Sequence, residues 1–114
     1  MKRKRPSRVE LLQGTLDLLI LRTLVAGPSH GHAIAKHILR TSEEAFKVET
    51  GSLYPALHRL EQKGWLKSEW RQSESGREAK FYSLTRAGER QREIEKHSWD
   101  RLAAAVRLIF NEGR

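Results

Sequence analysis

The residues best suited to chemistry lie together in residues 50–66, which read TGSLYPALHRLEQKGWL. A helix that begins in this segment would present free backbone amides and the positive end of its dipole, and both favour an anion. Gly51 adds no side-chain bulk, so a phosphate group can approach the backbone closely. Further along the helix are His58 and Arg59, and arginine can form two hydrogen bonds to guanine in a DNA major groove. The alternative is an ordinary amphipathic helix with a solvated polar face.

The same segment carries the signals of a helix with one buried stripe. Leu53, Leu57 and Leu60 recur at intervals of four and three residues, so one face should contact a core. Pro55 lacks an amide hydrogen and is tolerated only in the first turn, which predicts a helix start near Ser52. The hydroxyl of Ser52, or that of the threonine two residues earlier, is expected to cap the free amides. The polar residues would then lie on the side away from the core.

Two helices should precede this segment, and a hairpin and a helix should follow it. Apolar residues recur at helical spacing in residues 14–27 and again in residues 29–45. A short apolar piece, residues 46–48 (Phe46 to Val48), is expected to form a strand before the third helix. After Gly64 the runs WLKSEWRQ and EAKFYSL alternate apolar and polar residues, and SESGR between them supplies a turn. From Thr85 onward the pattern is helical again.

This order of elements predicts a mainly α fold with a small β-hairpin, of the α+β class. It is the layout of a winged helix-turn-helix domain followed by one long helix. We expect a basic disordered arm in residues 1–10, the winged helix-turn-helix DNA-binding domain in residues 11–84 and a C-terminal dimerisation helix in residues 85–114. The KRKR run of the arm, residues 2–5, would either add phosphate contacts or serve only as a solubilising tail.

The composition narrows the class of partner. The chain has 114 residues, which is room for one domain with one core, and 22 Lys and Arg against 14 Asp and Glu give a formal charge of +8. Such a surface favours a polyanion such as nucleic acid or an acidic membrane, unless the charge serves solubility alone. A membrane span needs about 18 consecutive apolar residues, and the sequence has no such run. We therefore expect a cytoplasmic protein without a membrane partner.

Neither catalysis nor metal binding is expected from the residue types. Cysteine is absent, which excludes disulfides, thiolate metal sites and a cysteine nucleophile. His30, His32 and His37 do not have the spacing that puts two imidazoles on one helical face. The only aspartates, Asp17 and Asp100, belong to no Ser/His/Asp arrangement, and no Gly-rich phosphate loop follows a strand. The sequence thus predicts no enzyme activity, no cofactor and no metal.

The C-terminal segment carries a candidate contact surface for a second copy of the chain. Trp99, Leu102, Val106 and Ile109 recur at intervals of three, four and three residues. A single chain would expose this stripe, whereas two copies related by a two-fold axis would bury it against each other or against the neighbour's first helix. The flat ring of Trp99 would also suit a pocket for a planar apolar small molecule, and plain interface packing is the alternative.

Four stretches of the chain resemble one known family. The motifs GTLDLLILRTL, GHAIAKHI, GSLYPALHRLEQKGWL and KFYSLTRAG, in this order from about Leu11 to Gly88, are similar to those of the PadR family of bacterial transcriptional regulators. Because only one helix follows the wing, the chain resembles the short subfamily with a single C-terminal dimerisation helix. It departs from the family at His32, where members commonly have a tyrosine after the glycine.

The resemblance implies a homodimeric repressor that holds double-stranded operator DNA until a small-molecule effector releases it. The DNA-binding residues expected in the recognition helix and the wing are Ser52, Tyr54, Pro55, His58, Arg59, Lys63, Arg71, Arg77 and Lys80. We therefore predict a sequence-specific regulator with an inverted-repeat operator. Two alternatives stay open, namely a winged-helix module that binds another protein and a protein that binds nucleic acid nonspecifically by charge.

Overall fold

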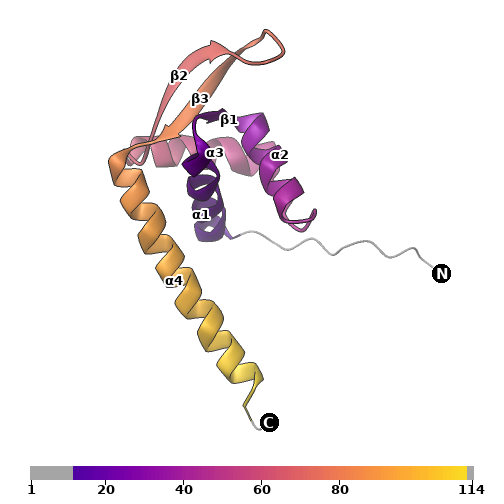
Figure 1. The fold of residues 1–114 in the computed structure, drawn as a ribbon, viewed down its shortest axis with the longest axis vertical. Helices are drawn as coiled ribbons and strands as arrows, with labels where there is room; N and C mark the ends of the chain where they lie inside the picture. Colours follow the sequence, from indigo (N-terminus) through magenta and orange to yellow (C-terminus); the bar gives the residue numbers. More distant parts are fainter. Residues whose placement is uncertain (1–11, 113–114) are drawn as a thin grey trace, which may run out of the picture.

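The computed structural model describes residues 12–112, which form a small helical body, a projecting hairpin and one long helix (Figure 1). The elements are α1 (Gln13–Thr23), the 3₁₀ turn η1 (Leu24–Ala26), β1 (Ser29–His30), α2 (Gly31–Thr41), α3 (Thr50–Gln62), β2 (Leu66–Gln72), β3 (Glu78–Leu84) and α4 (Arg86–Phe110). The predicted mainly α fold with a small sheet is confirmed, and the elements follow the order of a winged helix-turn-helix domain. The predicted arm of residues 1–10 lies outside the described residues.

The sheet has three antiparallel strands in the order β1-β3-β2. The short strand expected at residues 46–48 is wrong, because this segment is a loop whose Phe46 and Val48 side chains pack against the core. The third strand is instead formed by Ser29 and His30, which pair with the other edge of β3. The apolar residues of the loop therefore pack against the core. The second edge of β3 pairs with a segment that precedes α2.

The core lies between α1, α2, α3 and the base of the hairpin. The predicted stripe of Leu53, Leu57 and Leu60 is confirmed, because each of these side chains is at most 1% exposed. The other buried apolar residues are Leu16, Ile20, Leu21, Leu24, Ile34, Ile38, Ala56, Leu66 and Tyr82. Full burial of one large aliphatic side chain contributes about 1.5–3 kcal/mol. The core therefore holds α3 firmly, with its opposite face turned to solvent.

The start of α3 differs from the prediction. The helix begins at Thr50, and its first turn closes on the carbonyl of Glu49, which accepts hydrogen bonds from the amides of Ser52 and Leu53 at 3.0 and 2.9 Å. Within the described chain, no side chain caps this end, so the expected hydroxyl cap is wrong. Pro55 consequently lies beyond the first turn of α3. Because proline has no amide hydrogen, it donates no hydrogen bond to the carbonyl of the exposed Gly51.

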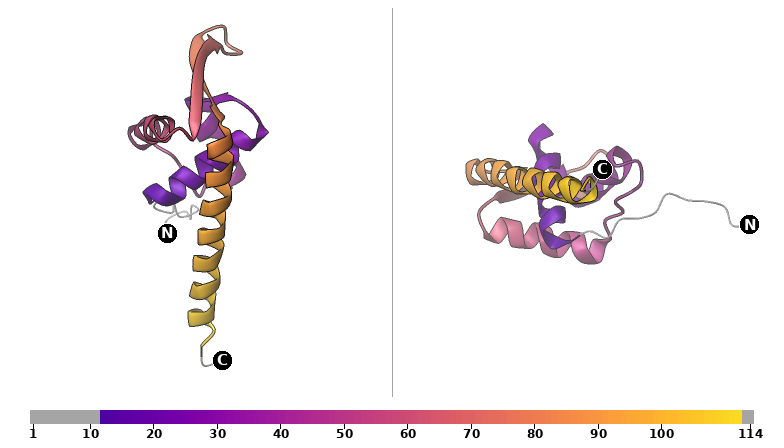
Figure 2. Two further views of the ribbon diagram at one scale, coloured as in Figure 1. Left: turned by 90° about the vertical axis from the view of Figure 1, so that its left-hand side faces the viewer. Right: turned by 90° about the horizontal axis from the view of Figure 1, so that it is seen from below.

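The long helix α4 is attached to the body at the turn between α3 and β2. The Thr85 side chain accepts from the Gly88 amide at 3.0 Å, and its hydroxyl donates to the Gly64 carbonyl at 2.6 Å. Its backbone amide also donates to the Trp65 carbonyl at 3.1 Å. Gly88 is buried here, and a Cβ atom on it would lie 2.0 Å from the Trp65 carbonyl oxygen. These contacts fix the direction in which α4 leaves the body, and its second half projects beyond it (Figures 1 and 2).

Candidate nucleic-acid interface

The exposed side of α3 carries small and polar residues, in contrast to its buried stripe of leucines. Gly51, Pro55, His58 and Gln62 are exposed and lie opposite the three core leucines in the 3.6-residue periodicity of the helix. We call these four residues the outer face of α3. A Cβ atom on Gly51 would meet no atom of the described residues within 4 Å. The helix therefore offers a small residue at its start, followed by two exposed side chains, His58 and Gln62, that can donate and accept hydrogen bonds.

Arg59 does not belong to this outer face, because it is paired with the first helix. Its Nη2 atom lies 2.5 Å from Oδ1 of Asp17, and the two side chains are 28% and 12% exposed. Burial raises the pKa of the Asp17 carboxyl, and the neighbouring Arg59 guanidinium offsets part of this increase. The geometry favours a structural role for Arg59, since reading a base would require this ion pair to open.

The remaining predicted residues of α3 take different positions around it. Ser52 is exposed at the start of the helix, and Lys63 at its end places its ammonium 4.8 Å from the centre of the Trp65 ring. Tyr54 is 45% exposed and packs its ring against the start of α2. A Cβ atom on Gly31 would lie 2.7 Å from that ring, so the glycine allows the close approach. Tyr54 thus occupies the corner between α2 and α3.

The three predicted cations of the wing do not share one face. Lys80 faces α3, with its ammonium 3.5 Å from Oε1 of Glu61. Arg71 lies on the opposite side of the hairpin, with its guanidinium 4.6 Å from the centre of the Phe81 ring. Arg77 is exposed at the tip, where Gly76 supplies the positive φ of 86° that the turn requires. Lys80 is therefore the wing cation that contacts α3, and Arg77 lines the same groove as Tyr54.

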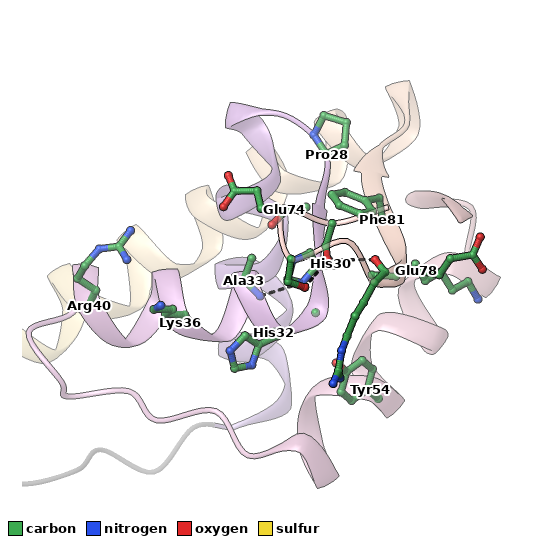
Figure 3. Close-up of a pocket in the computed structure, with 17 residues that line it drawn as sticks. Pro28, His30, His32, Ala33, Lys36, Arg40, Tyr54, Glu74, Glu78 and Phe81 are labelled. Atoms are coloured by element: carbon green, nitrogen blue, oxygen red, sulfur yellow. Dashed lines mark hydrogen bonds between the residues drawn. The ribbon is translucent and has the colours of Figure 1, made fainter. Parts of the chain in front are cut away.

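A groove of about 850 Å³ lies between α2, Tyr54 and the hairpin tip (Figure 3). One of its walls carries His32, Lys36 and Arg40, which are exposed and recur every four residues along α2. We call these three residues the α2 row, and Figure 3 shows them along one side of the helix. The other wall includes Arg77 and Lys80 together with the acidic Glu74 and Glu78. This shape and its cations suit a phosphate-bearing strand.

The sequence reasoning missed both the α2 row and the ion pair of Arg59. The interval of four residues in the row was a usable signal, because it places side chains on one helical face. Asp17 was a weaker signal, since a carboxylate within an apolar helix needs a cationic partner when it is buried. Its partner lies 42 positions away, and no local pattern identifies it.

Other kinds of site find no support in the described residues. Among residues 12–112, no group of three or more His, Asp or Glu side chains is placed to hold a metal ion. None of the helices in that range is long and apolar enough to cross a membrane.

The second half of α4 exposes the predicted apolar stripe. Trp99, Leu102, Val106 and Ile109 are between 43% and 69% exposed. We call these four residues the α4 stripe. The same alternation of four and three residues extends back to Gly88, which is buried, so the stripe continues the face by which α4 meets the body. The apolar residues themselves occupy these positions only from Trp99 to Ile109, because positions 92 and 95 are Arg and Glu. An exposed apolar stripe at such intervals is typical of helices that pair with other helices.

The sequence and the fold of this chain are similar to those of known transcriptional regulators. The model of the transcriptional regulator PadR-like family matches residues 20–94, which include α2, α3 and the hairpin. A transcriptional regulator from Mycobacterium tuberculosis is 32% identical over 97 residues, which cover 85% of this chain and 87% of that protein. The solved structure of a PadR family regulator from Eggerthella lenta is similar with a TM-score of 0.74 and 31% identity, over 89% of this chain and 86% of that chain. For a transcriptional regulator from Clostridium thermocellum the TM-score is 0.76 and the identity 27%, over 83% of this chain and 92% of that chain.

Proposed function

The chain belongs to the PadR-like family of transcriptional regulators, and we propose that it is a homodimeric repressor that binds an inverted-repeat operator in double-stranded DNA. The family comprises regulators of transcription and not enzymes. The observation that carries the proposal is that the α2 row, the hairpin residues Arg77 and Lys80 and Tyr54 of α3 line one groove, with the outer face of α3 next to Tyr54 on the same helix. A duplex placed there would meet polar and cationic groups from three elements.

Each part of this surface has a matching part of the duplex. The major groove is about 12 Å wide and accepts one helix, so α3 enters it with His58 and Gln62 directed at base edges. The exposed Gly51 lets the first turn of α3 approach a phosphate, which the free amides and the helix dipole favour. Ser52, Tyr54 and Lys63 flank this turn or the helix end and contact the backbone. Arg77 and Lys80 hold the strand beside the wing, while Arg71 lies over the Phe81 ring on the far side of the hairpin.

Dimerisation follows from the α4 stripe. A single chain leaves these apolar side chains in water, whereas a two-fold axis along the stripes would bury both copies at once. Such a dimer presents two copies of α3 to the same side of a duplex. Reading two major-groove half-sites requires a separation of about one DNA turn, roughly 34 Å, and favours an operator with inverted repeats.

Selection of binding sites from random duplex DNA at physiological salt tests the proposal. We expect an enriched inverted repeat that the wild-type protein binds about 1,000-fold or more tightly than scrambled DNA. In a matched pair of variants, His58→Ala should relax discrimination at particular base pairs, while Lys36→Ala should weaken all sequences alike and reduce the salt slope by about 1. Binding without any enriched sequence would contradict the proposal and support nonspecific recognition by charge. An absence of DNA binding would leave the protein-interaction module.

Repression and release complete the proposal. An operator that overlaps a promoter would exclude the polymerase, which transcription in vitro with purified components measures directly. Trp99 lies on the α4 stripe, so a planar apolar effector held between the two copies would contact its ring and alter the spacing of the α3 helices. Such molecules should quench Trp99 fluorescence and release operator DNA at the same concentrations. Quenching that leaves the complex intact would contradict this mode of release.

A further inference from the structure

The hairpin carries a large apolar side chain that the body of the protein leaves uncovered. Trp70 lies near the middle of β2 and is 65% exposed. Its neighbours in the same hairpin, Leu66 and Tyr82, are 2% and 6% exposed because they reach the core. Trp70 therefore contributes little to the packing of the fold, although an indole ring offers a large apolar surface to any partner that covers it.

The strand register shows which way Trp70 faces. Ser68 pairs with Tyr82, and Trp70 pairs with Lys80, so the side chains of all four lie on one face of the hairpin. This face looks toward α3, because Glu61 of α3 accepts a hydrogen bond from Ser68 at 2.7 Å and lies 3.5 Å from the Lys80 ammonium. Trp70 lies on the same face as Ser68, two residues further along β2 and further from the body.

The opposite face of the hairpin has a different chemistry. It carries three exposed residues of β2 that alternate with those of the α3-facing side, namely Lys67, Glu69 and Arg71. Arg71 is 3.3 Å from the carboxylate of Glu69 and lies over the Phe81 ring. The exposed indole ring and Lys80 are thus on the side of the recognition helix, and two of the other wing cations are on the far side.

We propose that Trp70 contacts operator DNA directly, with its indole ring packed against sugars and base edges of the minor groove next to the major groove that α3 occupies. The inference rests on the proposed function. A helix seated in a major groove places a ribbon beside it over the adjoining minor groove, and apolar side chains can insert there and open a base step. Lys80, the cross-strand partner of Trp70, adds a positive charge to the same face of the hairpin. Because the indole is uncharged, Trp70 adds contact and shape recognition without counterion release.

Substitution of Trp70 tests the inference on the full-length protein and its selected operator. Trp70→Ala should weaken operator binding about tenfold or more, in line with the effect of removing an aromatic platform from a nucleic-acid complex. The slope of log Kd against log salt concentration should stay that of the wild type, because no phosphate contact is lost. Trp70→Phe should retain a substantial part of the affinity, since it keeps a ring.

Lys67→Ala is the matched control, because Lys67 is the exposed neighbour of the same strand on the opposite face. If charge alone mattered, Lys67→Ala would weaken binding more than Trp70→Ala, and the inference predicts the reverse order. The melting temperatures of all variants should match the wild type within a few degrees, since both side chains are exposed. Fluorescence gives a second readout, because DNA should quench the wild-type emission and this component should disappear in Trp70→Phe.

The outcomes separate the two proposals. Wild-type protein that selects no operator would contradict the proposed function itself. Wild-type protein that selects an operator, together with Trp70→Ala that binds it equally tightly, would overturn the role of Trp70 and leave the proposed function intact. Loss of affinity with an altered salt slope would also overturn it, because the substitution would then have displaced charged contacts.

Discussion

At Gly51 the proposed phosphate contact and the stability of the helix would require different residues. It occupies the second position of α3, its backbone is helical, and a Cβ atom there would meet no atom of the described chain within 4 Å. Glycine in a helix costs about 0.5–1 kcal/mol relative to alanine. The fold therefore gains nothing from Gly51, whereas a phosphate contact at the start of α3 would need its absent side chain.

Gly51→Ala should consequently change stability and DNA binding in opposite directions. We expect the free energy of unfolding to rise by about 0.5 kcal/mol and operator affinity to fall about tenfold, the loss of one charge-assisted hydrogen bond to a phosphate. Denaturant unfolding and operator titration measure the two effects. Gly14→Ala is a matched control, because Gly14 holds the same position in α1 and its Cβ would also meet no described atom. Equal operator affinity in both variants would argue against a phosphate at Gly51.

The sequence was sufficient to place the polar face of α3, but not to decide which polar residues remain available there. The leucine interval located the buried stripe, and His58 and Gln62 followed from it. From the helical periodicity alone, Arg59 would be as exposed as His58, yet its guanidinium pairs with Asp17 of α1. Whether the Arg59 guanidinium contacts a DNA base or the Asp17 carboxylate depends on how two segments that are distant in the sequence pack. Local patterns contain no such information.

Among the elements, the junction of α4 with the body has the tightest geometry. Thr85 joins the helix start to the turn at Gly64 and Trp65, and Gly88 packs its backbone against the Trp65 carbonyl. A side chain at position 88 would push α4 away from this turn, because its Cβ atom would overlap the Trp65 backbone carbonyl, which cannot move aside as the end of a flexible side chain can. The direction of α4, and with it the geometry of any dimer, depends on this glycine.

Gly88→Ala should therefore destabilise the protein, even though alanine favours helices. The added methyl group overlaps a carbonyl oxygen, and overpacking of this kind costs about 1–3 kcal/mol. Thermal unfolding would show a midpoint lowered by several degrees. Arg86→Ala tests the same first turn at an exposed position and should leave the midpoint nearly unchanged. A Gly88→Ala midpoint equal to that of the wild type would mean that α4 can shift freely at this junction.

The existence of the long elements was predictable, whereas the smallest one was not. Repeated apolar intervals located the helices, and alternation located β2 and β3. The strand at Ser29 and His30 is too short to show alternation and exists because β3 has an edge to pair with. The apolar residues Phe46 and Val48 match the local pattern of a strand, but their side chains pack against the core. Both errors therefore come from tertiary contacts that a local pattern cannot contain.

At the scale of the whole molecule, the proposed function requires the α4 stripe to join two copies of the chain so that both α3 helices bind one duplex. The exposed side chains of the stripe lie on one face of α4, and Leu108, which is 73% exposed, lies on the other side of the helix. A dimer built on the stripe would cover Leu102 and leave Leu108 in water. Two leucines of the same helix thus provide a test in which residue type and exposure are closely matched.

Leu102→Arg should convert the dimer into a monomer, because it places a charge in the centre of an apolar contact, where an unpaired charge is costly. Leu108→Arg should remain dimeric by sedimentation velocity at the same concentration. Since linked half-sites gain a factor of about 10²–10⁴ from simultaneous binding, operator affinity should fall at least 100-fold in Leu102→Arg and stay close to the wild type in Leu108→Arg. Binding of a single half-site should be similar for all three proteins, because α3 and the wing are untouched. A monomeric wild-type protein, or the same mass for both variants, would show that the chain does not pair through this stripe.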